Sequence, residues 1–381
     1  MNSIQKIVVA TDKFRGSLSA YEAAVAVKEG LKGKDVLIRP MADGGEGSLD
    51  VVAFAFDEIG REYEKIYIDS VNQKGEELKV PVLIYDGGKS AFIEMATVCG
   101  LNLVPKDKRS LLHSTTYGLG EVMRVIIEDN GVRKIVLAIG GSGTNDGGFG
   151  MLTALGYRYH NTSVFRNKDI ATFIGCIEAI IDDPVETVTP HLKDCEISVI
   201  CDVKNPLLGK NGATMVYGRQ KGGTTDELNQ LESALENWAK VVEKYRGQKG
   251  LAREEGTGAA GGLGFALKAV LGATLLPGWK TLSDLMHLED EIRQADMVIT
   301  GEGKLDRQSF SGKLISGLAE MCRKYDKPLL VVTGRSEVSK SELSEYGVDK
   351  VIELSSSTID GESSFKDAAK IITREVGKLF E

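Results

Sequence analysis

KIVLAIGGSGTNDGGFGMLTAL, residues Lys134–Leu155, is the stretch from which we infer the fold. An apolar run leads into a turn in which glycine mixes with Ser, Thr, Asn and Asp, and a second apolar run begins at Met151. This order is typical of a buried strand, a tight turn and the start of a helix. Such a turn presents backbone N–H groups beside a helix N-terminus, an arrangement that holds anions such as phosphate. The stretch therefore predicts an α/β fold with a nucleotide site at this turn.

The same strand, loop and helix order recurs at both ends of the chain, and it predicts parallel strands joined by helices. Capping-box patterns starting at Ser19, Thr224 and Ser339 mark helix N-termini. From about residue 61, apolar or alternating runs are separated by Asn-Gln-Lys-Gly and Asp-Gly-Gly, as in antiparallel hairpins. The strands predicted near the two ends are 4–10, 35–39, 296–300, 328–333 and 349–354.

This rhythm predicts an α/β protein of two domains. Residues 1–60 and 293–381 are expected to form a discontinuous Rossmann-like or flavodoxin-like domain around a parallel five-stranded sheet. Residues 61–292 are expected to form an inserted mixed α/β domain. A chain of 381 residues is longer than one typical core supports, which also favours two domains.

Composition narrows the function classes. A net charge of -8 argues against a nucleic-acid partner, although a local basic pocket remains compatible with it. The 5 cysteines form no C-x-x-C pair, which indicates reduced thiols and a cytoplasmic protein. No apolar run approaches the roughly 20 residues of a membrane helix. The 4 histidines match no metal-binding pattern, so no structural zinc site is expected.

Basic residues occupy the loops that follow predicted strands. Ligands of open parallel sheets bind beyond the carboxyl ends of the strands. Lys13 and Arg15 follow the first strand, and Asp43 follows the second in the glycine-rich loop PMADGGEGS. Lys and Arg in such loops can clamp carboxylate or phosphate oxygens. We therefore expect Lys13, Arg15 and Asp43 to bind the substrate, with Arg15 the strongest candidate for an anionic group.

Acidic residues also follow predicted strands. Besides Asp43, they are Asp202, Glu302 and Asp306. For any one of them a turn-forming role is the more common one. Phosphoryl transfer, however, needs oxygen ligands for magnesium and a carboxylate near the attacking hydroxyl. As a group they therefore suggest catalysis, with Asp202 or Asp43 as the base and Asp306 or Glu302 beside the metal.

Two glycine clusters are candidates for contact with a nucleotide. In the first, we expect Gly140, Gly141, Ser142, Gly143 and Thr144 to bind the phosphates of a nucleotide. Asp146, in the same turn, would either ligate a metal or cap the following helix.

The second cluster, GTGAAGGLG at 256–264, matches G-x-G-x-x-G, but the preceding LAREE is not a strand. Gly258, Gly261 and Gly262 would contact nucleotide phosphates or simply allow close helix packing. A dinucleotide fingerprint also needs an acidic residue about 20 positions further on, and none lies between Leu275 and Thr281.

Seven blocks of the chain together resemble the bacterial type I glycerate kinases, in the order of that family. They are DKFRGSLSA, PMADGGEGS, IGGSGTNDGGFGMLTALG, CDVKNPLLGKNGA, GRQKG, GTGAAGGLG and ITGEGKLD. The resemblance implies ATP-dependent phosphorylation of D-glycerate, usually at the 2-hydroxyl, with Mg²⁺ as cofactor. It also implies a two-domain fold whose Rossmann-like part is built from both chain ends. A monomer or homodimer is expected.

The first block departs from the family pattern Pro-Asp-Ser-Phe-Lys-Gly. Thr11, Lys13 and Arg15 stand at its Pro, Ser and Lys positions. Arg keeps the charge of Lys but changes its reach and hydrogen-bond geometry, so a kinase for a related small hydroxy acid is one alternative. An NAD(P)-dependent hydroxy-acid oxidoreductase and a non-catalytic binding module are the others, and the missing fingerprint features and the many loop carboxylates disfavour them.

Overall fold

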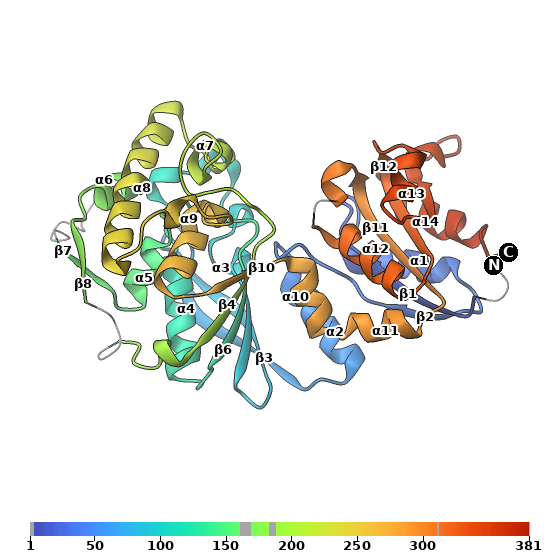
Figure 1. The fold of residues 1–381 in the computed structure, drawn as a ribbon, viewed down its shortest axis with the longest axis horizontal. Coiled ribbons are helices and arrows are strands. Elements are labelled where there is room, and N and C mark those ends of the chain that lie inside the picture. Colours follow the sequence, from blue (N-terminus) through green and yellow to red (C-terminus); the bar gives the residue numbers. More distant parts are fainter. Residues whose placement is uncertain (1–3, 161–168, 183–187, 311, 381) are drawn as a thin grey trace. The chain divides into compact units, whose positions relative to one another are not determined.

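The computed structural model describes residues 4–160, 169–182, 188–310 and 312–380 (Figure 1). The chain forms two compact units. Unit 1 comprises Met1–Asp43, Asp50–Gly60 and Pro277–Glu381, and unit 2 comprises Gly44–Leu49 and Arg61–Leu276. Compared with the predicted division, Gly44–Leu49 groups with unit 2, and residues 277–292 group with unit 1.

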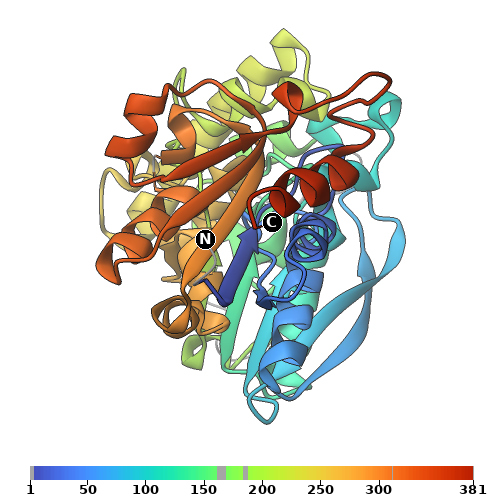
Figure 2. The same cartoon turned by 90° about the vertical axis from the view of Figure 1, so that its right-hand side faces the viewer.

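Unit 1 is built on a parallel five-stranded sheet of order β13-β12-β11-β1-β2. Counted along the chain, this is the flavodoxin-like order 2-1-3-4-5. β1, from the N-terminal end, and β11, from the C-terminal part, lie side by side in Figure 1 and, from another side, in Figure 2. The predicted flavodoxin-like domain made from both chain ends is therefore confirmed. Its strands are β1 (Lys6–Thr11), β2 (Asp35–Ile38), β11 (Met297–Leu305), β12 (Leu329–Ser336) and β13 (Lys350–Glu353).

Two strands are longer than predicted. β11 continues through the GEGKL segment, beyond the predicted strand end at residue 300, and Lys304 and Leu305 pair with Arg335 and Ser336 of β12. The extension has no apolar signature because the pairing partner, and not local hydrophobicity, supports it. Glu302 therefore lies in a strand, and Asp306 directly follows it.

Helices cover both faces of this sheet. α1 packs against α14, and together they bury Ile7 and Val9 of β1. α11 and α12 contact the same sheet but contribute no residue to that cluster, so they lie on the opposite face. The predicted capping boxes at Ser19 and Ser339 are both formed. The helices are α1 (Ala20–Gly30), α2 (Ser48–Ile59), α10 (Gly278–Leu285), α11 (Leu288–Gln294), α12 (Leu314–Lys324), α13 (Lys340–Glu345) and α14 (Ala368–Gly377).

Unit 2 is built on a mixed six-stranded sheet of order β10-β9-β6-β5-β4-β3. β3, β4 and β5 pair antiparallel, as the hairpin signals predicted, whereas β5, β6, β9 and β10 run parallel. The strands are β3 (Tyr63–Val71), β4 (Glu77–Tyr85), β5 (Ser90–Glu94), β6 (Lys134–Ala138), β9 (Glu196–Ile200) and β10 (Thr274–Leu276), and a separate two-stranded sheet joins β7 (Arg158–His160) to β8 (Ala179–Asp182).

The helices of unit 2 close a large apolar core around Trp238, which is fully buried. Phe149 lies edge-on to Trp238, with ring centroids 5.8 Å apart. The predicted capping box at Thr224 starts the longest helix, α8. Among the described residues, every helix is too short or too polar to cross a membrane. The helices are α3 (Ala96–Cys99), α4 (Tyr117–Glu128), α5 (Phe149–Ala154), α6 (Ile170–Gly175), α7 (Ala213–Tyr217), α8 (Thr225–Arg246) and α9 (Ala259–Phe265).

Candidate active site

The predicted site residues fall into two groups, one in each unit. In unit 1 they lie where the sheet changes direction of winding, between β1 and β11, which is where open α/β sheets bind ligands. The backbone N–H of Asp12 donates to the Gly301 carbonyl at 2.8 Å, and that of Met41 donates to the Thr11 carbonyl at 2.8 Å. These bonds hold the ends of β1, β2 and β11 together.

The predicted substrate-binding residues do come together in unit 1. The ammonium of Lys13 lies 3.0 Å from Asp43 Oδ1, and the guanidinium of Arg15 lies 3.9 Å from Asp43 Oδ2. Arg15 has 85% of its side chain exposed, so its charge is available to an anionic ligand, whereas Lys13 is mostly buried beside Asp43. The loops after β1 and β2 thus place two cations around one carboxylate.

Sequence reasoning missed Asp12, the residue directly after β1. Its carboxyl is half-buried and accepts a hydrogen bond from the Lys13 backbone N–H at 2.6 Å. Burial and the neighbouring carboxylates of Asp43 and Glu302 raise the pKa of Asp12 to about 7. A carboxyl that titrates near neutral pH in a ligand-binding position is suited to proton transfer. The position just after a buried strand was the only local signal for it.

Glu302 and Asp306 offer oxygen ligands on the same rim. Burial raises the pKa of Glu302, and its Oε1 is buried without a hydrogen-bond partner in the described part of the chain. Asp306 accepts from the Gln308 backbone N–H at 2.9 Å and lies 3.3 Å from the Lys304 ammonium. Across the described residues, no three His, Cys, Asp or Glu side chains form a metal cluster. Mg²⁺ commonly takes one or two carboxylates together with waters and substrate phosphates, and the Glu302 Oε1 that lacks a partner in the described part of the chain is suited to such a role.

The glycine turn of unit 2 is more buried than expected. Gly141 is exposed and Gly140 half-exposed, but Ser142, Gly143 and Thr144 are buried. The N–H groups of Gly140 and Gly143 donate to the carbonyls of Gly44 and Cys99 at 2.9 and 2.8 Å. Much of the turn's hydrogen-bonding capacity is therefore used inside the protein. A phosphate could reach only its Gly140–Gly141 corner.

Asp146 is fully buried below that turn. Its carboxylate accepts hydrogen bonds from the backbone N–H groups of Thr116, Gly148 and Gly150 at 2.7, 3.1 and 3.1 Å, and from the Thr116 hydroxyl at 2.8 Å. Burial raises the pKa of Asp146, and these bonds oppose the rise. With its oxygens occupied in this way, Asp146 holds the turn and the start of α5, and a metal has no room on it. Of the two roles foreseen for Asp146, the geometry favours the cap.

The second glycine cluster packs against the first. Gly261, at φ 68°, presses its backbone on Thr144 and Asn145, and a Cβ there would lie 2.6 Å from Asn145 Cα. Gly147 N–H donates to the Gly261 carbonyl at 3.0 Å. Gly258 and Gly262 are buried as well. Close packing therefore accounts for these glycines, and a short turn at Leu251–Arg253, not a strand, precedes them, unlike a dinucleotide fingerprint.

Asp202, the other predicted base, belongs to unit 2. It is half-buried and follows β9. The neighbouring Asn205 accepts a hydrogen bond from the Tyr217 hydroxyl at 2.8 Å, which anchors this loop to α7.

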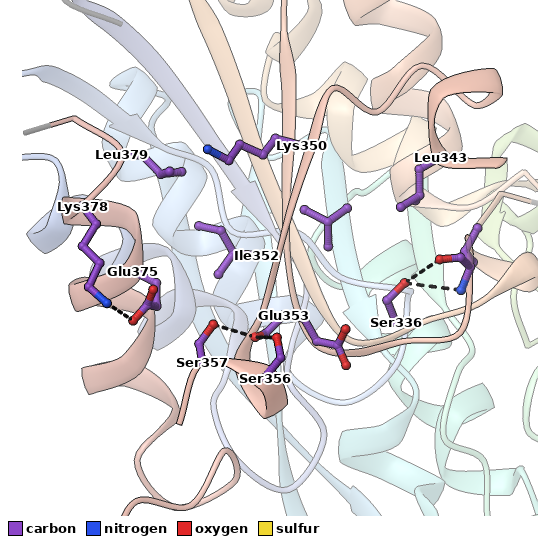
Figure 3. Close-up of a pocket in the computed structure, with 12 residues that line it drawn as sticks. Ser336, Leu343, Lys350, Ile352, Glu353, Ser356, Ser357, Glu375, Lys378 and Leu379 are labelled. Carbon is purple, nitrogen blue, oxygen red and sulfur yellow. Dashed lines mark hydrogen bonds and ion pairs between the residues drawn. The ribbon is translucent and has the colours of Figure 1, made fainter. Parts of the chain in front are cut away.

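A cavity of about 490 Å³ lies elsewhere in unit 1, along the edge strand β13 (Figure 3). Lys350, Ile352 and Glu353 line it from β13, and Glu375 of α14 and Lys378, which directly follows α14, line it as a pair joined by a 2.8 Å hydrogen bond. None of the predicted site residues borders this cavity. Because ligands of such sheets bind at the switch point, we locate the candidate site at the Asp12 rim instead.

Comparison with known proteins agrees over nearly the whole chain. Residues 7–381 match the Glycerate kinase family. Glycerate kinase of Bacillus subtilis (strain 168) and glycerate 2-kinase of Escherichia coli (strain K12) are each 36% identical over 97% of this chain and 95% of their own length. A crystal structure from Salmonella typhimurium LT2, provisionally assigned as glycerate kinase 2, superposes with a TM-score of 0.81 at 34% identity, covering 99% of this chain and 98% of that one. The chain therefore belongs to the glycerate kinase family.

Proposed function

We propose that this protein is an ATP-dependent glycerate kinase that phosphorylates D-glycerate, at the 2-hydroxyl, in the cytoplasm. The family match over residues 7–381 carries this proposal. The relative from Escherichia coli named glycerate 2-kinase supports the 2-position. The cysteines, all of them free thiols, suit the reducing environment of the cytoplasm. We expect a monomer or a homodimer.

Arg15 is proposed to bind the glycerate carboxylate. Its exposed guanidinium can form two parallel hydrogen bonds with a carboxylate, the strongest geometry for such a pair. The 3.0 Å ion pair with Lys13 fixes the position of the Asp43 carboxylate, which is therefore proposed to hold a substrate hydroxyl. These assignments keep Lys13, Arg15 and Asp43 as substrate-binding residues.

Asp12 is proposed as the proton acceptor. As the glycerate oxygen attacks the γ-phosphorus of ATP, its proton passes to the Asp12 carboxylate, the bond between the phosphorus and the β,γ-bridging oxygen breaks, and ADP leaves. A base is most effective when its pKa lies near the working pH, and the pKa of Asp12, about 7, meets that condition. Asp202, the base expected from the sequence, is the competing candidate.

The nucleotide is proposed to contact unit 2 at the Gly140–Gly141 corner of the glycine turn. Ser142, Gly143, Thr144, Gly258, Gly261 and Gly262 would support that corner from inside. Glu302 and Asp306 would hold Mg²⁺, which neutralises phosphate charge during transfer. Asp146 is left out of the metal site because its oxygens already accept hydrogen bonds.

The proposal is tested by a coupled assay of ADP release with ATP, Mg²⁺ and D-glycerate. Robust release that depends on D-glycerate is expected, and parallel reactions with related hydroxy acids measure the preference. Phosphorus and proton NMR of the product then distinguishes 2-phosphoglycerate from 3-phosphoglycerate. A folded enzyme that releases no ADP with D-glycerate or its relatives would refute the kinase assignment.

A further inference from the structure

The GRQKG block at residues 218–222 has no role in the function proposed above, and it contains a buried lysine. Arg219–Lys221 form a single 3-10 turn between α7 and α8, which Gly222 ends at φ 95°. Arg219 and Gln220 face solvent, whereas Lys221 is only 3% exposed. Lysine is rarely buried without a specific partner, so this ammonium group requires an explanation.

The partners of Lys221 lie in the glycine turn. Its Nζ donates to the Thr144 carbonyl at 2.6 Å and to the Ser142 hydroxyl at 3.2 Å. The same hydroxyl accepts from the Thr144 backbone N–H at 3.2 Å. Lys221 thus connects Ser142 and Thr144, the buried residues that follow the exposed Gly140–Gly141 corner in the chain.

A second bond from the same segment fixes the turn at another point. Asn145 donates from its side-chain amide to the Thr214 hydroxyl at 2.9 Å, and both residues are fully buried. Thr214 lies in α7, immediately before the 218–222 block. Thr214 and Lys221 together therefore bond three residues of the turn, namely Ser142, Thr144 and Asn145.

The charge on Lys221 adds to its geometry. Burial lowers its pKa to about 8, while the neighbouring Cys99 and Asp146 raise it. Burial also raises the pKa of the Cys99 thiol, which stays neutral. The ammonium therefore places positive charge behind a turn whose outer corner would meet the phosphates, where low dielectric makes such charge effective.

We propose that Lys221 is a positioning residue for the nucleotide: it holds the Gly140–Gly141 corner in the shape that binds ATP phosphates. This inference rests on the proposed kinase function. A lysine with a purely structural role would change stability and leave the KM for ATP unchanged. A lysine that positions the corner changes the KM for ATP selectively.

The test is Lys221→Met, which keeps an unbranched side chain one atom shorter and removes its charge and donors. We expect the KM for ATP to rise about tenfold or more, as for the loss of hydrogen bonds from a charged group, with the KM for D-glycerate within twofold of wild type. Lys240→Met is the matched control, because Lys240 is an exposed lysine of α8 that forms an ion pair with Glu236. Its KM values should equal those of wild type.

Ser142→Ala provides a second test if Lys221→Met does not fold. It removes one of the two acceptors of the Lys221 ammonium and leaves the other, the Thr144 carbonyl. A rise of a few-fold in the KM for ATP is expected. An unchanged KM for ATP in either folded variant, or an equal rise in both KM values, would overturn the inference. An inactive wild-type enzyme would instead contradict the kinase proposal. In that case, calorimetric titration of wild type and Lys221→Met with ATP would still measure the effect of the substitution on ATP binding.

Discussion

The glycine turn of unit 2 and the charged rim of unit 1 both follow parallel strands, yet they differ in almost every physical respect. The turn is buried from Ser142 onward, and its geometry is fixed by hydrogen bonds and by backbone pressed against backbone. The rim consists of side chains that are half-buried or exposed, and burial together with the neighbouring carboxylates raises the pKa of Asp12 there. The turn is therefore suited to holding a ligand in a fixed place, and the rim is suited to moving a proton.

The largest expected effect is on the rim. Asp12→Asn keeps the shape of the side chain and removes the proposed proton acceptor, so kcat should fall by about 10²–10⁴-fold. The KM for ATP should stay within about threefold of wild type. Steady-state kinetics with both substrates varied measures this. Asp202→Asn is the matched comparison, since it changes the competing carboxylate in the same way.

A loss of turnover in Asp202→Asn, with a normal Asp12→Asn enzyme, would move the base to unit 2. Circular dichroism and thermal unfolding of both variants are needed to show that each one folds. Proton transfer would then be a function of unit 2 and not of the rim in unit 1.

Substitutions in the glycine clusters of unit 2 should lower the free energy of unfolding. Gly261→Ala would drive a Cβ into the Thr144–Asn145 backbone at a positive φ, so we expect it to lose about 3 kcal/mol or more. Gly131→Ala is the control, because Gly131 has a similar φ of 74° but nothing within 4 Å of its Cβ position. It should lose only the 1–2 kcal/mol, roughly, of left-handed strain. Urea unfolding of the two variants measures the difference, and equal losses would contradict close packing at Gly261.

A smaller effect is expected on the pH dependence of stability. The pKa of Asp12 is about 7 in the folded protein against a model-compound value of 3.8. Between these values the folded state binds one more proton than the unfolded state, so the contribution of Asp12 to stability falls as pH rises and levels off above 7. This decrease in stability should be absent from Asp12→Asn, because the amide does not titrate.

Scanning calorimetry of wild type and Asp12→Asn at pH 5 and pH 8 measures that difference. The difference in melting temperature, variant minus wild type, should be larger at pH 8 than at pH 5. Parallel shifts in the two proteins would mean that the carboxyl of Asp12 titrates at its ordinary pKa.

Much of the fold could be predicted because its signals are local. Apolar runs predicted the five strands of unit 1. Ser19, Thr224 and Ser339 predicted helix starts, because each forms a capping box with the residue three positions further along the chain. The far half of β11 could not be found in this way, because pairing with β12 stabilises it and its own residues are polar.

The site was less predictable, since its properties arise from residues distant in sequence. Asp12 looks like an ordinary aspartate after a strand, and its unusual pKa comes from burial in the folded protein and from the neighbouring carboxylates of Asp43 and Glu302. Lys221 looks like a surface lysine in the sequence. Its burial is explained by the hydrogen bonds that its ammonium donates to Ser142 and Thr144, which are distant in sequence. Asp146 was ambiguous between metal ligand and cap until Thr116 and Gly150 were seen to donate to it.

The division of labour between the two regions is tested most directly by crossed kinetics on Arg15→Met and Gly141→Ala. Gly141 has φ 77° and open space around it, with its nearest neighbour atom 3.7 Å from a Cβ, so alanine alters the exposed corner without crowding the core. We predict that Arg15→Met raises the KM for D-glycerate about tenfold or more and leaves the KM for ATP unchanged, and that Gly141→Ala does the opposite. Variants that raise both KM values equally, or that exchange these effects, would contradict the assignment of substrate to the rim and nucleotide to the turn.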